Sequence, residues 1–310
     1  MYKIPILFII FNRPQIANQA FEVIKTVKPK YLYIASDAAR DNKAGEDALV
    51  QQTRDMILHN IDWDCNVNTL FHSKNQGCGM GVYTAISWFF NHVNMGIILE
   101  DDCIVDRTFF FYMEELLIRY QNDDRIGMVA GTNPIVLDHY QYSYLFSKYK
   151  SCWGWGTWKR AWNNMDIDMV WRNSDISPSV LNNSGYRGKD ISNWKSKLRY
   201  IDNNYVSAWD WQWYFSLSAQ NQLCIYPSVN LVSNIGSDKN ATHTSLSNIT
   251  IKSGFILFPL KHPLYIVSNV EFDKLFYKNT NTLCLKIQRM IPYNIKQKIK
   301  RILLKLQNNA

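Results

Sequence analysis

The sequence of 310 residues predicts an α/β fold around a mainly parallel, Rossmann-like β-sheet flanked by helices. Two observations carry this prediction. Short apolar runs, typical of strands buried on both faces, alternate with segments whose apolar residues recur at helical spacing. The connections between them are short, as expected for a doubly wound sheet with right-handed crossovers. With 47% apolar and 19% charged residues, the chain can bury one large core.

The first element is IPILFIIF (residues 4–11), which is uniformly apolar and stops at Asn12-Arg13-Pro14. It lacks a small-residue cleavage site, so we expect a β-strand and not a signal peptide. The same patterns predict the following elements in order. Further strands are expected at 31–36, 65–72, 96–99 and 126–131, and helices at 14–27, 46–60, 80–93 and 108–120.

Beyond about residue 131 the alternation fades, and aromatic residues concentrate in SCWGWGTWKRAW (151–162) and AWDWQWYF (208–215). We therefore expect a second half with long loops, built on the edge of the same sheet. The predicted organisation is a ligand-binding half at 1–130, a second half at 131–255 and a basic extension at 256–310.

Polar residues follow the predicted strand ends. Arg13, Asp37, Lys74 and the triplet Glu100-Asp101-Asp102 each come directly after a strand. Ligands of open α/β sheets bind beyond the carboxyl ends of the strands, so these residues are expected to share one crevice. The glycine-rich stretch 77–81 opens a helix and fits either a phosphate loop or a tight turn.

Three adjacent carboxylates repel one another unless a cation holds them. Mg²⁺ and Mn²⁺ prefer oxygen ligands and keep coordination positions open for phosphate oxygens, so the triplet predicts a metal or nucleotide site. The competing interpretation, an acidic helix N-terminus, fits less well because the triplet lies about six residues before the predicted helix at Thr108.

The sequence argues against several other classes of protein. No stretch of about 18 apolar residues predicts a membrane-spanning helix. The six cysteines form no CxxC pair, which favours reduced thiols in a cytosolic protein over a zinc site or a disulfide framework. Nucleic-acid binding is not expected, because the basic residues lack an interleaved aromatic platform.

IILEDD resembles the Glu-Asp-Asp version of the DxD motif of GT-A glycosyltransferases of the N-acetylglucosaminyltransferase I type, as found in bacterial surface-polysaccharide synthesis. ILFIIFNRP, YIASDA, CWGWGTWKRAW, AWDWQW and PSVNLVSNIGSDKNATHT resemble other segments of that family in the same order, over roughly residues 1–250. The resemblance implies a GT-A fold, an inverting glycosyltransferase and a UDP-sugar donor such as UDP-N-acetylglucosamine. The family carries two adjacent acids between tryptophans, whereas here Asp210 stands alone.

The resemblance also implies roles for individual residues. Asp102 would be the ligand of Mn²⁺ or Mg²⁺, and Asp210 would be the general base that deprotonates the acceptor hydroxyl. The resemblance would place Arg13, Asp37, Asp101, Thr242 and His243 against the nucleotide sugar. Lys74 and Glu100 join the expected contacts because of their positions at strand ends. The acceptor would lie against Trp153, Trp155, Trp209 and Trp211, although core packing is the alternative for each tryptophan.

The chain ends in a basic segment, LKIQRMIPYNIKQKIKRILLKL (285–306), whose isoleucines recur at helical spacing. Such a segment is typical of a helix lying on an anionic membrane, and a docked helix or a dimer contact are the alternatives. A peripheral position at the inner face of the cytoplasmic membrane would suit a lipid-diphosphate-linked glycan acceptor.

Two other functions remain open at this point. A nucleotidyltransferase also carries acids at the end of a parallel strand, and a non-catalytic, membrane-associated sugar-nucleotide-binding protein would keep the pocket without the reaction. The sequence specifies neither the donor sugar and acceptor nor the oligomeric state.

Overall fold

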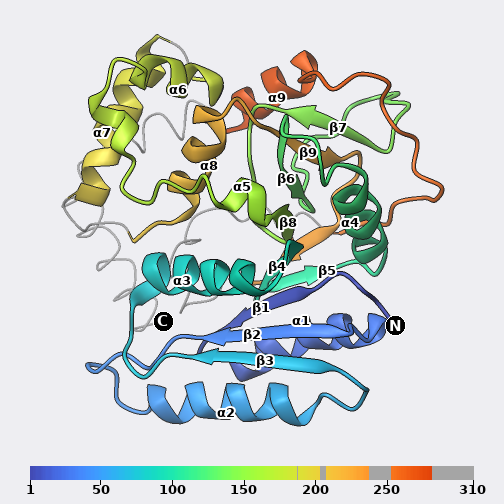
Figure 1. Ribbon diagram of the computed structural model, residues 1–310, viewed down its shortest axis with the longest axis vertical. Coiled ribbons are helices and arrows are strands. Elements are labelled where there is room, and N and C mark those ends of the chain that lie inside the picture. The colour runs from blue at the N-terminus through green and yellow to red at the C-terminus, as the bar shows by residue number, and fades with distance from the viewer. Residues whose placement is uncertain (187, 203–206, 237–252, 281–310) are drawn as a thin grey trace, which may run out of the picture.

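The computed structural model describes residues 1–186, 188–202, 207–236 and 253–280 (Figure 1). The strands are β1 Ile6–Ile10, β2 Tyr31–Ser36, β3 Asn66–Phe71, β4 Met95–Glu100, β5 Cys103–Val105, β6 Ile126–Ala130, β7 Tyr144–Ser147, β8 Trp155–Trp158, β9 Leu223–Pro227 and β10 Val232–Asn234. The helices are α1 Pro14–Val27, α2 Glu46–His59, α3 Gly77–His92, α4 Thr108–Arg119, α5 Lys159–Trp162, α6 Ser177–Asn183, α7 Lys189–Asp202, α8 Asp210–Ala219 and α9 Val270–Thr280, with a 3₁₀ turn at Val170–Asn173.

Eight strands form one sheet in the order β3-β2-β1-β4-β8-β6-β9-β7. The four strands from β3 to β4 are parallel, as are β6 and β9, whereas β8 and β7 run antiparallel to their neighbours. The predicted α/β class, with a Rossmann-like, mainly parallel sheet flanked by helices, is therefore confirmed. Because β8 inserts between β4 and β6, strands of the two predicted halves share one sheet.

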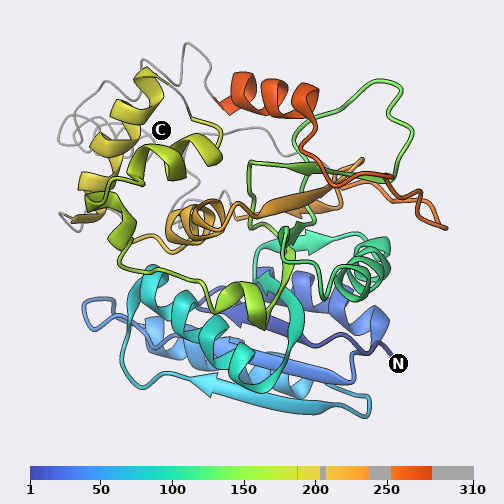
Figure 2. The same ribbon diagram turned by 45° about the horizontal axis from the view of Figure 1, so that its top comes forward.

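The sheet separates two apolar cores. Alternate side chains of β1 point to opposite faces, so Ile6 and Phe8 pack against α1 and α4, whereas Leu7 packs against α3. The second face is also covered by α5, α8 and α9. Figure 2 shows this layering from a second direction. A smaller core joins α6 and α7 to α8.

The predicted elements up to residue 131 agree with the structure to within a few residues. The helix at 14–27 and the strand at 31–36 have the predicted bounds, and α3 begins three residues earlier than expected. The sequence patterns missed β5, β7, β8, β9 and β10, whose three to five residues are too few to show a period.

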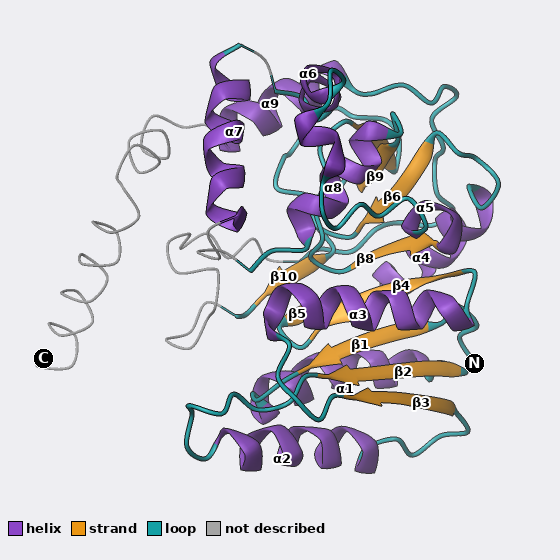
Figure 3. Cartoon of the chain, turned by 60° about the vertical axis from the view of Figure 1, so that its left-hand side comes forward, coloured by secondary structure: helices purple, strands orange, loops and turns teal. Residues whose placement is uncertain are grey.

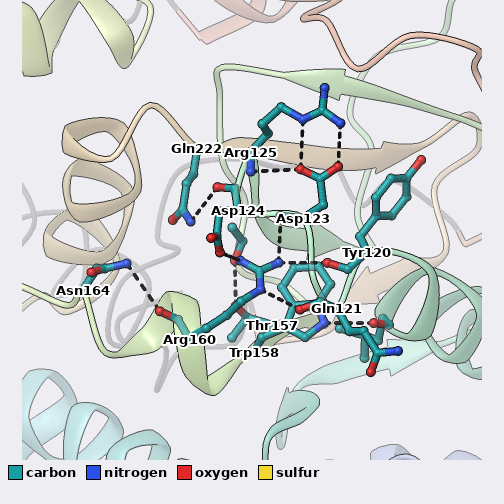
Figure 4. Close-up of polar contacts among 12 residues, drawn as sticks. Tyr120, Gln121, Asp123, Asp124, Arg125, Thr157, Trp158, Arg160, Asn164 and Gln222 are labelled. Atoms are coloured by element: carbon teal, nitrogen blue, oxygen red, sulfur yellow. Dashed lines mark hydrogen bonds and ion pairs between the residues drawn. The ribbon is translucent and has the colours of Figure 1, made fainter.

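Arg160 on α5 joins the second half to the end of α4. Its guanidinium donates to the carbonyls of Tyr120, Gln121 and Asp123 at 2.8 to 2.9 Å, and it lies 4.5 Å from the ring centre of Trp158 (Figure 4). These bonds fix the end of β8 against the α4–β6 turn. Arg160 thus helps to hold the short antiparallel strand β8 in register beside β4.

A buried lysine follows the edge strand β7. Lys150 is 7% exposed and donates to Ser218 Oγ at 2.6 Å, and burial lowers the pKa of Lys150 to about 7. The unfolded chain keeps this proton up to about pH 10.4. Between pH 7 and 10 the unfolded state therefore binds more protons, and the free energy of unfolding should rise with pH.

We expect Lys150→Met to remove this rise, which amounts to about 2 kcal/mol between pH 7.5 and 9.5. Urea unfolding at the two pH values measures it, with Lys148→Met on the same loop as the matched control. Equal pH slopes in wild type and Lys150→Met would show that the lysine keeps an ordinary pKa.

Candidate active site at the carboxyl edge of the sheet

The parallel strands β1, β2 and β3 end on the same side of the sheet (Figure 3). Three of the predicted site positions fall at this edge: Arg13 after β1, Asp37 after β2, and Glu100-Asp101-Asp102 at the end of β4. The register aligns Ile9 of β1 with Glu100, which brings the residues that follow the two strands together. The edge therefore gathers a guanidinium and four carboxylates.

Arg13 bridges two members of the triplet. Its Nη2 forms ion pairs with Asp101 Oδ1 and, at 2.9 Å, with Asp102 Oδ2. Burial opposes the charge of Arg13, but the two aspartates raise its pKa above the ordinary value. Asp101 is 4% exposed, and burial raises its pKa to about 6 against the opposing effect of Arg13. The guanidinium therefore stabilises a buried carboxylate that would otherwise be costly.

Asp102 is held from a second direction by the segment that follows β9. Asn234 Nδ2 donates to Asp102 Oδ1 at 3.1 Å, and the Ile235 amide donates to the Asp102 carbonyl at 2.9 Å. Gly236 donates to Asn234 Oδ1 at 2.9 Å and approaches Asp102 so closely that a Cβ would lie 2.1 Å from Oδ2. This backbone fixes the direction of the carboxylate.

Gly236→Ala should therefore displace either Asp102 or residues 234–236. We expect a loss of affinity for UDP and Mn²⁺ of at least about tenfold, since the misplaced group is the proposed ligand. Titration calorimetry measures this, and Gly254→Ala is the matched control because nothing lies within 3.8 Å of its added Cβ. Unchanged affinity in Gly236→Ala would show that the Asp102 carboxylate need not keep this orientation.

Asp37 holds the start of α3. Its carboxylate accepts the backbone N–H groups of Gln76 and Gly77 at 2.9 to 3.0 Å, and Gly77 has a φ of +76°. The helix dipole favours a negative charge there. The glycine-rich stretch is therefore a tight turn capped from within the protein. Of the two sequence interpretations of residues 77–81, the structure favours the turn over the phosphate loop.

The start of α3 also contacts the segment before Asp210. Gly79 donates its N–H to Ser207 Oγ at 2.8 Å, and a Cβ on Gly79 would lie 3.1 Å from the carbonyl of Ala208. A side chain at position 79 would thus push this segment away. Asp210 follows as the first residue of α8, where the helix dipole stabilises its negative charge.

Electrostatic coupling joins Asp210 to the triplet. Burial, followed by the charges of Asp102, Asp101 and Asp210, raises the pKa of Glu100 to about 8. Cys78 lies among the same acids: burial, followed by the charges of Glu100 and Asp210, raises the pKa of its thiol to about 12. A carboxyl group that keeps its proton at neutral pH thus lies near a second acid on another element.

A divalent cation at the triplet would need ligands beyond the protein carboxylates. Asp101 Oδ2 is buried without a hydrogen-bond partner in the described part of the chain, and one guanidinium does not balance the triplet. Within residues 1–186, 188–202, 207–236 and 253–280, no three His, Cys, Asp or Glu side chains are grouped to hold a metal ion. Oxygen atoms of a bound diphosphate would have to complete the coordination.

The predicted acceptor tryptophans separate into two pairs. Trp155 and Trp209 are 0% and 4% exposed and stack with ring centres 5.8 Å apart, so neither offers a face to an acceptor. This corrects the expectation for both: they fill the core between β8 and α8. Trp153 is 36% exposed, and Trp211 is half-buried with its ring centre 5.2 Å from that of Trp194.

Lys74 lies exposed on the loop between β3 and α3, and Thr242 and His243 lie outside the described residues. Sequence reasoning missed Asn234, Gly236 and Ser207 as contributors. The first two belong to the segment PSVNLVSNIGSDKNATHT, where an asparagine two residues before a glycine was the available signal.

Comparison with known proteins finds only distant resemblance to solved structures. No protein-family model matches the sequence. No curated protein matches it either. Solved structures that resemble parts of the chain include an apo UDP-glucose pyrophosphorylase (8% identity, 74% of this chain and 93% of that one, TM-score 0.36). Others are HddC from Yersinia pseudotuberculosis complexed with GMP-PN (11%, 52% and 78%, 0.31) and 4-diphosphocytidyl-2C-methyl-D-erythritol synthase from Anaerococcus prevotii (10%, 63% and 82%, 0.31). At these scores the likeness carries no argument about function.

Proposed function

We propose that this protein is an inverting, metal-dependent glycosyltransferase that moves a sugar from a nucleotide sugar, UDP-linked by preference, to a hydroxyl of a glycan acceptor. One observation carries the proposal. Asp210, the first residue of α8, is near enough to the acidic triplet that ends β4 for its charge to raise the pKa of Glu100. Transfer of a sugar from a nucleoside diphosphate sugar requires a base for the acceptor hydroxyl and a cation for the departing diphosphate.

Each side chain has a distinct task in this proposal. Asp102 and Asp101 would hold Mn²⁺ or Mg²⁺, which supplies neutralising charge for the departing diphosphate. Arg13 orients both carboxylates through its ion pairs. Asp210 takes the proton of the acceptor hydroxyl as that oxygen attacks the anomeric carbon. Attack by the activated acceptor itself is a single displacement and therefore inverts the configuration.

The acceptor would approach from the side of α8. Trp153 and Trp211 are partly exposed and so can contact a sugar. Trp153 lies two residues before β8, and Trp211 follows Asp210 in α8. N-acetylglucosamine as the donor sugar and a lipid-diphosphate-linked glycan as acceptor remain part of the proposal. Both derive from the family resemblance of the sequence motifs.

Two alternatives can be separated from the proposal. A nucleotidyltransferase would join a nucleoside triphosphate to a sugar phosphate and release pyrophosphate, and the triplet with Arg13 would also suit that reaction. A non-catalytic binding protein would bind the nucleotide sugar and turn over neither substrate set.

The test is a panel of nucleotide sugars with Mn²⁺, assayed for release of the nucleoside diphosphate with and without glycan acceptors, beside a panel of nucleoside triphosphates with sugar phosphates. We expect release of UDP that depends on metal and is accelerated by an acceptor. Pyrophosphate release in the second panel would favour the nucleotidyltransferase. Binding without turnover in either panel would leave the binding protein.

A further inference from the structure

The segment between residues 254 and 269, here named the strap, exposes an unusual amount of apolar surface. In Figures 1 and 2 it is the orange-red trace at the edge of the molecule beside α4 and β7. Its side chains Phe255, Leu257, Leu264, Tyr265 and Val267 are 65 to 81% exposed, and Phe258 is 42% exposed. Exposed apolar side chains gathered in one short segment in this way are typical of an interaction site.

The strap presents these side chains from a fixed backbone. Ile256 and Leu260 are 4% and 5% exposed and pack into the core that contains α1 and α4. The Ile256 amide donates to Thr108 Oγ1 at 3.1 Å, and Ser143 and Lys261 exchange bonds of 2.8 to 2.9 Å. Phe258 contacts Phe111 of α4, 41% exposed, and so extends the patch onto that helix.

Charge identifies the kind of partner. Residues 254–310 contain 10 of the 34 basic side chains and 2 of the 26 acidic ones, so the whole formal net charge of +8 belongs to them and the first 253 residues are balanced. The strap itself has Lys261 and His262 and no acid. Aromatic and aliphatic tips joined to a cationic segment fit the headgroup region of an anionic bilayer.

We propose that the strap inserts its apolar side chains into the interface of an anionic membrane, while the cationic residues that follow supply the electrostatic attraction. A second copy of the chain is disfavoured as the occupant, since each copy would bring the same positive charge to the contact. In the described part of the chain no helix has the length and apolarity to cross a bilayer.

The strap begins beside the candidate site. Its neighbour Ser253 donates a backbone N–H to Ser233 Oγ at 2.8 Å, and Ser233 precedes Asn234, which contacts Asp102. Membrane contact would thus place the candidate site, at the carboxyl edge of the sheet, near the bilayer surface. The inference does not depend on the proposed reaction, because membrane binding is measured without any substrate.

The experiment is sedimentation of the full chain with vesicles of phosphatidylglycerol and phosphatidylcholine, and with phosphatidylcholine alone, at low salt and at about 0.5 M salt. Leu257→Ser/Leu264→Ser/Val267→Ser is compared with wild type. Leu49→Ser/Leu58→Ser/Val67→Ser is the matched control, because these side chains are exposed on α2 and β3 at the far end of the sheet. All substituted side chains are exposed, so both variants should fold, which thermal unfolding checks.

We expect wild type to prefer the anionic vesicles and the strap variant to lose at least about tenfold in partition coefficient, with the difference persisting at high salt where electrostatic attraction is screened. The control variant should bind like wild type. Equal partition of the strap variant and wild type would overturn the proposal. A wild-type protein that is dimeric, with a strap variant that is monomeric, would also overturn the proposal, because a second copy of the chain would then cover the strap.

Discussion

Asp210→Asn should reduce transfer by about 10³-fold while leaving nucleotide affinity within about twofold of wild type. Asparagine keeps the size of the side chain but cannot accept the proton of the acceptor hydroxyl. It should also largely preserve the start of α8, because the change removes only the interaction of the charge with the helix dipole, worth about 0.3 to 1 kcal/mol. The loss should appear in kcat, with KM for the donor little changed.

The matched control is Asp47→Asn, which changes an exposed acid in the first turn of α2 and is expected to have no effect. The measurement is steady-state release of the nucleoside diphosphate in the presence of an acceptor, with equilibrium binding of UDP measured in parallel. Full transfer by Asp210→Asn would mean that the base lies elsewhere.

Arg13→Met should destabilise the protein by about 3 kcal/mol at pH 8, because it leaves Asp101 buried and charged without its ion pair. The same substitution should cost much less at pH 5. Burial already raises the pKa of Asp101 to about 6, and removing Arg13 raises it further, so at pH 5 the carboxyl takes up a proton and no unpaired charge remains.

Urea unfolding at the two pH values measures this difference. Lys25→Met is the control, since its partner Asp62 is exposed and such surface pairs contribute about 0 to 1 kcal/mol. Mn²⁺ in excess should restore part of the lost stability by occupying the position of the guanidinium. A destabilisation that does not change with pH would point to lost packing of the arginine stem instead of an unpaired charge.

Apart from β5, the elements of the first 131 residues follow from the sequence because local pattern governs each of them. The apolar run of β1 and the helical spacing of α1 fix both the elements and their order. Parallel strands then bring their carboxyl ends to one edge, which is why Arg13 could be placed beside Asp101 and Asp102 from strand ends alone.

The remaining features depend on contacts between residues far apart in the chain. WGTW at 155–158 carries no period of its own, and it becomes a strand because β4 and β6 flank it. Trp209 has the composition of a sugar-binding residue but is buried because Trp155 stacks on it. The contact of Gly236 with Asp102 joins positions more than 130 residues apart, which no local pattern encodes.

Thermal unfolding with UDP and Mn²⁺ tests the central claim most directly, because it asks whether the edge of the sheet binds a nucleoside diphosphate through its carboxylates. We expect UDP with Mn²⁺ to raise the unfolding temperature of wild type and of Asp210→Asn, and to leave that of Asp102→Ala unchanged. The absence of a shift with any nucleotide in the wild-type protein, or an equal shift in Asp102→Ala, would contradict the account.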